Sequence, residues 1–263
     1  MTNGAVNLRI HIAPVGFEFR RVTEPLVRMQ ADKVYLVTYK PDDPAKRFFG
    51  LVKKELGQNY KHINVEEVFV DMWDLYSCLE EYRKIVTFER KAGNHVYINV
   101  STGTKINAIA GMLACMLWEA SPYYAPISYL TSRQLEVPPT EQVQDPDLLP
   151  VYEIKRPRSE QLFVLGLLSA NGGKMRKAKL IQELESGKII RVKDESRVAL
   201  TESAKHSQLR AIINPMEMEW GFINVEASGR RSVVSITEEG QTALRIFGSA
   251  NKLTEEEKAN GTS

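Results

Sequence analysis

Two kinds of apolar segment alternate along the first half of the chain. Short runs such as 33–38 have the composition of buried strands, and each is followed by a segment such as 44–56, in which apolar residues recur at helical spacing. Strands that alternate with helices of about 10–15 residues are typical of a parallel sheet with right-handed crossovers. The pattern therefore predicts an α/β fold, with a Rossmann-like parallel sheet domain over residues 1–132. We expect strands at 7–15, 33–38, 63–70, 96–100 and 126–130, and helices at 20–30, 44–56, 75–88 and 105–119.

A different pattern begins after residue 132. Five prolines lie among polar residues in 133–157, so this segment is expected to be a semi-rigid linker. Residues 158–250 then predict three helices, a β-hairpin and a closing helix, which is the order of an α+β winged helix-turn-helix domain. The last residues, 251–263, are expected to form a flexible tail.

Composition and charge narrow the class of protein. The chain is 43% hydrophobic and 26% charged, as in ordinary globular proteins, and its two cysteines are expected to be buried thiols of an intracellular protein. It has no basic-then-apolar leader, and its longest apolar run, 106–118, is shorter than the roughly 20 residues that span a bilayer. We therefore expect a cytoplasmic protein without a membrane segment. Residues 152–210 carry 13 Lys and Arg against 7 Asp and Glu, which suits either a polyanionic partner or a solvated face.

Two loops of small residues are candidate ligand sites. In an open parallel sheet, ligands bind beyond the carboxyl ends of the strands, where the strand order reverses. The loops 13–18 and 99–105 follow the first and fourth expected strands. The second loop opens a helix, so its free N–H groups and the helix dipole favour an anion, to which Lys105 adds a positive charge. The alternative is that its Ser and Thr residues only cap the helix. Neither loop matches a Walker A loop or a G-x-G-x-x-G fingerprint, which argues against an NTPase or a dehydrogenase.

The chain resembles the CRISPR-associated Rossmann-fold (CARF) family in three features. They are these two loops, the Ala-rich helix after the second loop and the winged helix beyond the linker. The Thr-Gly-Thr-Lys run at 102–105 is the most specific part of this resemblance, which covers nearly the whole chain. The resemblance implies a homodimeric sensor in antiviral defence that binds cyclic tetra- or hexa-adenylate across its two-fold axis, with no further cofactor. Glu18 and Glu24 depart from this expectation because they place carboxylates near an anion site. The ligand-binding residues implied are Val15, Gly16, Phe17, Asn99, Ser101, Thr102, Gly103, Thr104 and Lys105.

The winged helix domain predicts contact with double-stranded DNA. The apolar side chains of its third helix are expected to face the core, so the polar side chains between them face solvent. These polar side chains suit base edges in the major groove. Basic residues of the preceding helix and of the hairpin suit phosphates. The alternative is a winged helix used for dimerisation or protein contacts. Pro215 is expected to break the third helix, whose buried face is predicted at 209, 212, 213 and 216. The expected DNA-binding residues are Lys174, Arg176, Lys177, Ser207, Gln208, Arg210, Arg230 and Arg231.

Together the two domains indicate a transcription regulator in which a ligand shifts the population of DNA-binding conformations. The main alternative is an enzyme, in which Ser101, Thr102 and Lys105 stabilise developing charge during slow, metal-independent cleavage of the cyclic ligand. A second alternative is a binding module for another nucleotide. No histidine has a Cys or carboxylate at ligand spacing, so no metal site is expected.

Overall fold

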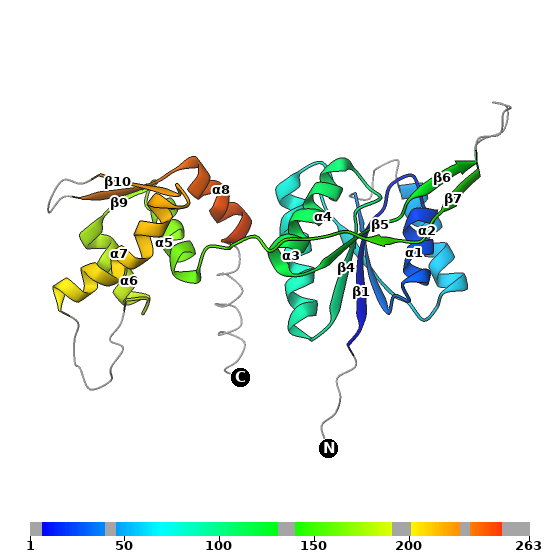
Figure 1. The fold of residues 1–263 in the computed structure, drawn as a ribbon, viewed down its shortest axis with the longest axis horizontal. Coiled ribbons are helices and arrows are strands. Elements are labelled where there is room, and N and C mark those ends of the chain that lie inside the picture. Colours follow the sequence, from blue (N-terminus) through cyan, green and yellow to red (C-terminus); the bar gives the residue numbers. More distant parts are fainter. Residues whose placement is uncertain (1–6, 40–45, 131–139, 191–200, 227–231, 249–263) are drawn as a thin grey trace, which may run out of the picture. The chain divides into compact units, whose positions relative to one another are not determined.

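The computed structural model describes residues 7–39, 46–130, 140–190, 201–226 and 232–248, and the chain divides into two compact units, Met1–Lys155 and Arg156–Ser263 (Figure 1). The elements of the first unit are β1 (Arg9–Pro14), α1 (Arg20–Arg28), β2 (Lys33–Thr38), α2 (Lys46–Asn59), β3 (Asn64–Phe69), α3 (Leu75–Lys91), β4 (His95–Asn99), α4 (Lys105–Trp118), β5 (Ser121–Tyr124), β6 (Ile127–Leu130), β7 (Thr140–Val143) and β8 (Asp147–Leu148). A sheet of order β3-β2-β1-β4-β5-β8 is parallel except where β8 pairs with β5. Helices α1 and α2 cover one face and α3 and α4 the other (Figure 1), which confirms the predicted Rossmann-like α/β fold.

The central strands are apolar because helices cover both of their faces. Ile10 and Ile12 of β1 and Ile98 of β4 are fully buried. The two cysteines, Cys78 on α3 and Cys115 on α4, are buried free thiols, as the sequence predicts. Burial raises the pKa of Cys78 to about 11, so this thiol stays protonated at neutral pH.

Two predictions for residues 121–157 need correction. The strand that lies beside β4 is β5, whereas the expected closing strand at 126–130 forms β6 and pairs with β7 in a separate two-stranded sheet. Strands β7 and β8 both fall in the segment 133–157 that is expected to be a linker. Pro122 within β5 and the polar residues of β7 conceal these strands from a pattern-based prediction, since main-chain pairing with neighbouring strands forms them without an apolar run.

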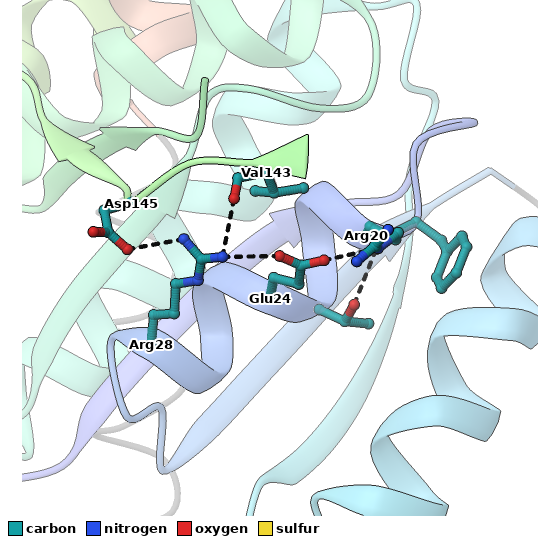
Figure 2. A network of polar contacts seen from close by, with 7 residues as sticks. Arg20, Glu24, Arg28, Val143 and Asp145 are labelled. Carbon is teal, nitrogen blue, oxygen red and sulfur yellow. Dashed lines mark hydrogen bonds and ion pairs between the residues drawn. The ribbon is translucent and has the colours of Figure 1, made fainter. Parts of the chain in front are cut away.

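Polar contacts hold the β6–β7 hairpin against α1 (Figure 2). Arg28 Nη2 donates to the carbonyl oxygen of Val143 at 2.9 Å and to Glu24 at 3.1 Å, while its Nη1 lies 2.8 Å from Asp145. Glu24 also accepts from Arg20 Nε at 2.7 Å. Exposed ion pairs of this kind contribute about 0–1 kcal/mol each, so their main effect is to fix where the hairpin lies on α1.

The second unit is a winged helix domain. Its elements are α5 (Ser159–Ala170), β9 (Lys174–Arg176), α6 (Lys177–Ser186), α7 (Glu202–Met218), β10 (Ile223–Glu226), β11 (Val233–Ile236) and α8 (Glu238–Phe247). The three strands form an antiparallel sheet of order β10-β11-β9, and Leu165, Leu180 and Val234 lie in the core between helices and sheet. The predicted α+β winged helix-turn-helix is therefore confirmed. Across the described parts of both units, no helix combines the length and the apolar character needed to cross a membrane.

The prediction that Pro215 breaks the third helix is wrong, because α7 continues to Met218. Proline has no N–H, so the carbonyl of Ala211, four residues earlier, lacks its helical donor. Arg158 Nη2 lies 3.5 Å from that carbonyl oxygen and donates to it. The helix is therefore completed by a side chain from the residue that precedes α5.

Candidate functional site

The strand order reverses between β1 and β4, which are neighbours in the sheet. From β1 the chain continues outward through β2 and β3, and from β4 it continues in the opposite direction through β5. Open α/β sheets bind ligands at such a switch point. The loops after these two strands, 15–19 and 100–104, meet here, and we call them the switch-point loops.

Two glycines form the contact between the switch-point loops. A Cβ atom on Gly16 would lie 3.0 Å from the main-chain nitrogen of Gly103. Gly103 itself has a φ of +77°, and a Cβ there would lie 2.6 Å from Pro14 Cβ and 2.8 Å from Asn107 Oδ1. Any other residue at Gly103 would meet both an unfavourable backbone conformation and a clash. The two main chains approach this closely because Gly16 has no Cβ and because Gly103 adopts a backbone conformation that favours glycine.

Helix α4 begins in a capping box. Thr104 Oγ1 accepts from the N–H of Asn107 at 3.1 Å, and Asn107 Oδ1 accepts from the N–H of Thr104 at 2.9 Å. The Thr104 hydroxyl also donates to the carbonyl of Met72 at 2.9 Å. Thr104 thus caps the helix, but capping leaves other donors unused. Within residues 100–107, the main-chain N–H groups of Thr102, Gly103, Lys105 and Ile106 have no acceptor in the described part of the chain.

Several polar side chains of the second switch-point loop bond within the domain. The hydroxyl of Thr102, which is 5% exposed, donates to the carbonyl of Pro14 at 2.6 Å. Asn99 is fully buried, and its Oδ1 accepts from the N–H of Ser101 at 2.9 Å. The Oγ of Ser101 accepts from the N–H of Ala125 at 2.6 Å, which leaves its own proton for another partner. The side chains of Thr102 and Asn99 therefore shape the loop.

Asn99 also completes helix α1. Pro25 lies inside this helix, so the carbonyl of Arg21, four residues earlier, lacks a helical donor. Asn99 Nδ2 donates to that carbonyl at 2.9 Å. The last residue of β4 thus joins the second switch-point loop to α1.

Arginines neutralise the two carboxylates near the switch-point loops. Glu18 lies 2.8 Å from Arg21 Nη1, and Glu24 contacts the arginines of α1 shown in Figure 2. Burial lowers the pKa of Arg21, but its hydrogen bonds to Glu18 and Tyr124 raise it, and the net pKa lies above the ordinary value. Lys105 is exposed and has no ion-pair partner within the described residues. The positive charge of Lys105 is therefore available, while the nearby negative charges are paired.

Large aromatic side chains are exposed beside the switch-point loops. Phe17 is 70% exposed and packs edge-to-face on Phe48, whereas its neighbour Val15 is fully buried in the core. Trp73, in the loop between β3 and α3, is 71% exposed and lies next to Tyr39. Trp73 is not among the residues that the sequence indicates, because a single aromatic in a polar loop belongs to no periodic pattern.

The side chains of α7 divide between core and surface. Ser207 and Arg210 are exposed and Gln208 is partly exposed, whereas Arg230 and Arg231 lie outside the described residues. The buried face predicted for this helix is confirmed. It consists of Leu209, Ile212, Ile213 and Met216.

A basic hollow of about 590 Å³ lies at the start of α6. Lys174 and Arg176 are exposed there, and Lys177 is partly exposed. The N–H of Lys177 donates to the carbonyl of Ser232 at 2.9 Å, which places the start of α6 beside the start of the β11 arm of the hairpin. The hollow is lined by Asn171, Lys174, Met175, Arg176, Ala178, Lys179 and Gln182.

Two archaeal proteins are similar to this chain in sequence. A protein of Methanocaldococcus jannaschii, named "Uncharacterized protein MJ1513", is 29% identical in an alignment 204 residues long that covers 66% of this chain and 60% of that protein. An uncharacterized protein of Archaeoglobus fulgidus is 22% identical over 216 residues, which are 82% of this chain and 87% of that protein. The matched region thus spans less than two thirds of the first relative and most of the second.

Solved structures with a similar chain path include three proteins at low identity. Can2 from Sulfobacillus thermosulfidooxidans, in complex with cyclic tetra-adenylate, is 11% identical with a TM-score of 0.38, over 91% of this chain and 64% of that chain. Enterococcus italicus Csm6, bound to cyclic hexa-2'-fluoro-hexa-dAMP, is 15% identical with a TM-score of 0.38, over 45% of this chain and 33% of that chain. A type III CRISPR defence DNA nuclease activated by cyclic oligoadenylate is 13% identical with a TM-score of 0.40, over 82% of this chain and 35% of that chain.

Two family models match the chain, one in each unit. Residues 9–128 match the family described as HFX_2341_N-like, N-terminal, and residues 160–248 match the DUF6293 C-terminal winged helix domain. The first match covers the parallel part of the sheet, and the second covers α5 to α8. The chain is therefore similar to the HFX_2341_N-like family over its N-terminal part and to the DUF6293 winged helix domain over its C-terminal part.

Proposed function

We propose that this chain is a ligand-responsive regulator whose first unit binds cyclic oligoadenylate and whose winged helix binds double-stranded DNA. The observation that carries the proposal is the group of unbonded N–H donors at the start of α4, on Thr102, Gly103, Lys105 and Ile106. These donors stand at the switch point of the sheet, where the contact between Gly16 and Gly103 exposes main chain rather than side chains.

The chemistry of this group favours a phosphate. Main-chain N–H groups at a helix start carry partial positive charge, and the helix dipole adds to it. Lys105 supplies a full charge and Ser101 a hydroxyl proton. Glu18 is paired with Arg21, so its carboxylate does not oppose an anion. Cyclic oligoadenylate is the phosphate ligand that the resemblance of 101–105 to the CARF family implies.

The surface of α4 supports the proposal of a homodimer. Ile109 on this helix is 50% exposed, and Ile106 and Leu113, at helical spacing from it, are partly exposed. Such an apolar stripe on an outer helix face is typical of a protein interface. A second copy related by a two-fold axis would bring a second, equivalent set of N–H groups at the start of its own α4. A ring with several phosphates would then contact two equivalent sets of N–H groups.

Contact with DNA follows from the two faces of α7 and from the basic hollow. The buried stripe of α7 leaves Ser207 and Arg210 exposed, and these side chains suit base edges. Lys174 and Arg176 lie at the start of α6 and suit phosphates. The hydroxyl of Thr102 is bonded to the carbonyl of Pro14, so in a ring nuclease only Ser101 and Lys105 of the three predicted residues could act on the ligand.

Isothermal titration calorimetry with cyclic tetra- and hexa-adenylate tests the ligand. We expect the wild type to bind one of the rings and Lys105→Ala to weaken binding by about tenfold, since a charged contact to phosphate is lost. The matched control is Lys54→Ala, which removes an exposed lysine from α2 and is expected to bind like the wild type. The absence of binding to either ring, or equal losses in both variants, would contradict the proposal. Chromatography of the recovered ligand decides between a regulator, which leaves the ring intact, and a ring nuclease, which yields linear products.

A further inference from the structure

Two exposed aromatic side chains, Phe17 and Trp73, belong to residues whose neighbours in the chain lie close to Gly103. Phe17 follows Gly16, whose main chain packs against Gly103, and Trp73 follows Met72. The Cε of Met72 would lie 3.2 Å from a Cβ on Gly103, and its carbonyl accepts from Thr104 at 2.9 Å. Consecutive Cα atoms are about 3.8 Å apart, so both aromatic residues begin close to the N–H groups at the start of α4.

A second ring holds each of these side chains in place. Phe17 packs edge-to-face on Phe48, with ring centroids 5.2 Å apart and an interplanar angle of 89°. Trp73 lies 6.2 Å from the ring of Tyr39 at an angle of 38°. The exposed fractions of Phe17 and Trp73, 70% and 71%, show that most of each ring still faces water. Rings that are already oriented lose little conformational freedom when a planar group stacks on them.

We propose that Trp73 and Phe17 stack on bases of the nucleotide whose phosphate is held at the start of α4. This inference rests on the proposed function and deepens it, because the site then recognises the base as well as the phosphate. Aromatic side chains stack on the π-face of any base, without reading its hydrogen-bonding edge. The larger ring system of a purine offers more stacking surface than a pyrimidine, so the site prefers adenine to uracil.

The test compares two rings that carry the same phosphates but different bases. Cyclic tetra-adenylate and cyclic tetra-uridylate are titrated by calorimetry into the wild type, Trp73→Ala and Trp73→Phe. We expect Trp73→Ala to weaken binding of the adenylate ring by about 5- to 100-fold and of the uridylate ring by less, and Trp73→Phe to retain most of the affinity. Phe17→Ala is expected to act in the same direction. The matched control is Phe88→Ala, since Phe88 is 65% exposed but lies near the end of α3 that precedes β4.

Two further measurements keep the result interpretable. Equal melting temperatures of Trp73→Ala and Phe88→Ala exclude loss of fold as the cause of weaker binding. In the wild type the adenylate ring should quench tryptophan fluorescence, and Trp73→Phe should abolish the quenching, because Trp118 is buried and Trp220 lies in the second unit. Wild-type affinity of Trp73→Ala for the adenylate ring would overturn the stacking inference and leave the proposed function standing. No binding of either ring by the wild type would overturn both.

Discussion

Gly103 determines what the second switch-point loop is able to hold. Its positive φ and the absence of a Cβ let the loop lie directly against Pro14 and Gly16. In that conformation the N–H groups of Gly103 and Thr102 have no acceptor in the described part of the chain. A larger residue would push the loop away from β1 and would redirect these donors.

Gly103→Ala should therefore affect both stability and binding. We expect the free energy of unfolding to fall by about 1–3 kcal/mol, from the positive φ and the overlap with Pro14, and the affinity for the adenylate ring to fall at least about tenfold. Urea denaturation and calorimetry measure the two effects. The control is Gly50→Ala in α2, where a Cβ would meet no atom within 4 Å and alanine should add about 0.5–1 kcal/mol of stability. Wild-type stability and affinity in Gly103→Ala would contradict this account.

The sequence indicates the switch-point loops correctly but not the task of each residue in them. Small residues between a strand and a helix are visible in the sequence, and so is the charge of Lys105. The sequence does not reveal that Asn99 bonds to the carbonyl of Arg21 and Thr102 to that of Pro14. These partners are 78 and 88 residues away along the chain. Side-chain bonds to a distant main chain leave no periodic signal.

Two helices contain a proline, and each is completed by a side chain from elsewhere. Asn99 donates to the carbonyl freed by Pro25 in α1, and Arg158 donates to the carbonyl freed by Pro215 in α7. A rule that ends a helix at proline therefore fails at Pro215. The lost bond is replaced by a donor from outside the helix, and the helix ends only at Met218.

A double-mutant cycle tests the link between Asn99 and Pro25. Asn99→Ala leaves the carbonyl of Arg21 and the N–H of Ser101 without partners, and we expect it to cost about 2–4 kcal/mol in the free energy of unfolding. Pro25→Ala restores a helical N–H for that carbonyl, so it should recover about 1 kcal/mol in the Asn99→Ala background but not in the wild type. Chemical denaturation of the four proteins gives the coupling energy. Strictly additive changes would show that the two residues act independently.

At the scale of elements, burial decides what the sequence reveals. Strands β1, β2 and β4 are predictable because covered sheets leave continuous apolar runs. The short strand β9 and the polar strand β7 cannot be predicted in this way. Each has only three or four residues and pairs at the edge of a small sheet, which requires no continuous apolar run. The helices of the winged helix domain follow from their buried stripes, such as that of α7.

The proposed function assigns a different polyanion to each unit of the molecule. If the ligand changes affinity for DNA, DNA must change affinity for the ligand by the same factor, because coupling between binding sites is reciprocal. The basic hollow at the start of α6 is the part of the second unit best suited to phosphates, since Lys174 and Arg176 line it.

Salt dependence measures how many phosphates that surface contacts. Arg176→Ala should weaken binding to a mixed-sequence DNA duplex and lower the slope of log K against log salt by about 0.9, because one phosphate contact is lost. Arg90→Ala, an exposed arginine of the first unit, removes the same charge and should leave the slope unchanged. Fluorescence anisotropy at several salt concentrations gives both slopes. A slope that Arg176→Ala does not alter would remove this surface from the DNA interface.

The contact between Gly16 and Gly103 has a consequence for how such chains diverge. A Cβ on Gly16 would meet the main chain of Gly103, whereas Gly103 is required by its own positive φ and by the nearby Pro14. A change at Gly103 that moves the loop therefore removes the reason to retain Gly16. Descendants that keep the anion-holding arrangement should inherit both glycines together. Lineages that abandon it are free to lose both. Under the proposed function, the pair of glycines would then mark which homologues still bind a nucleotide.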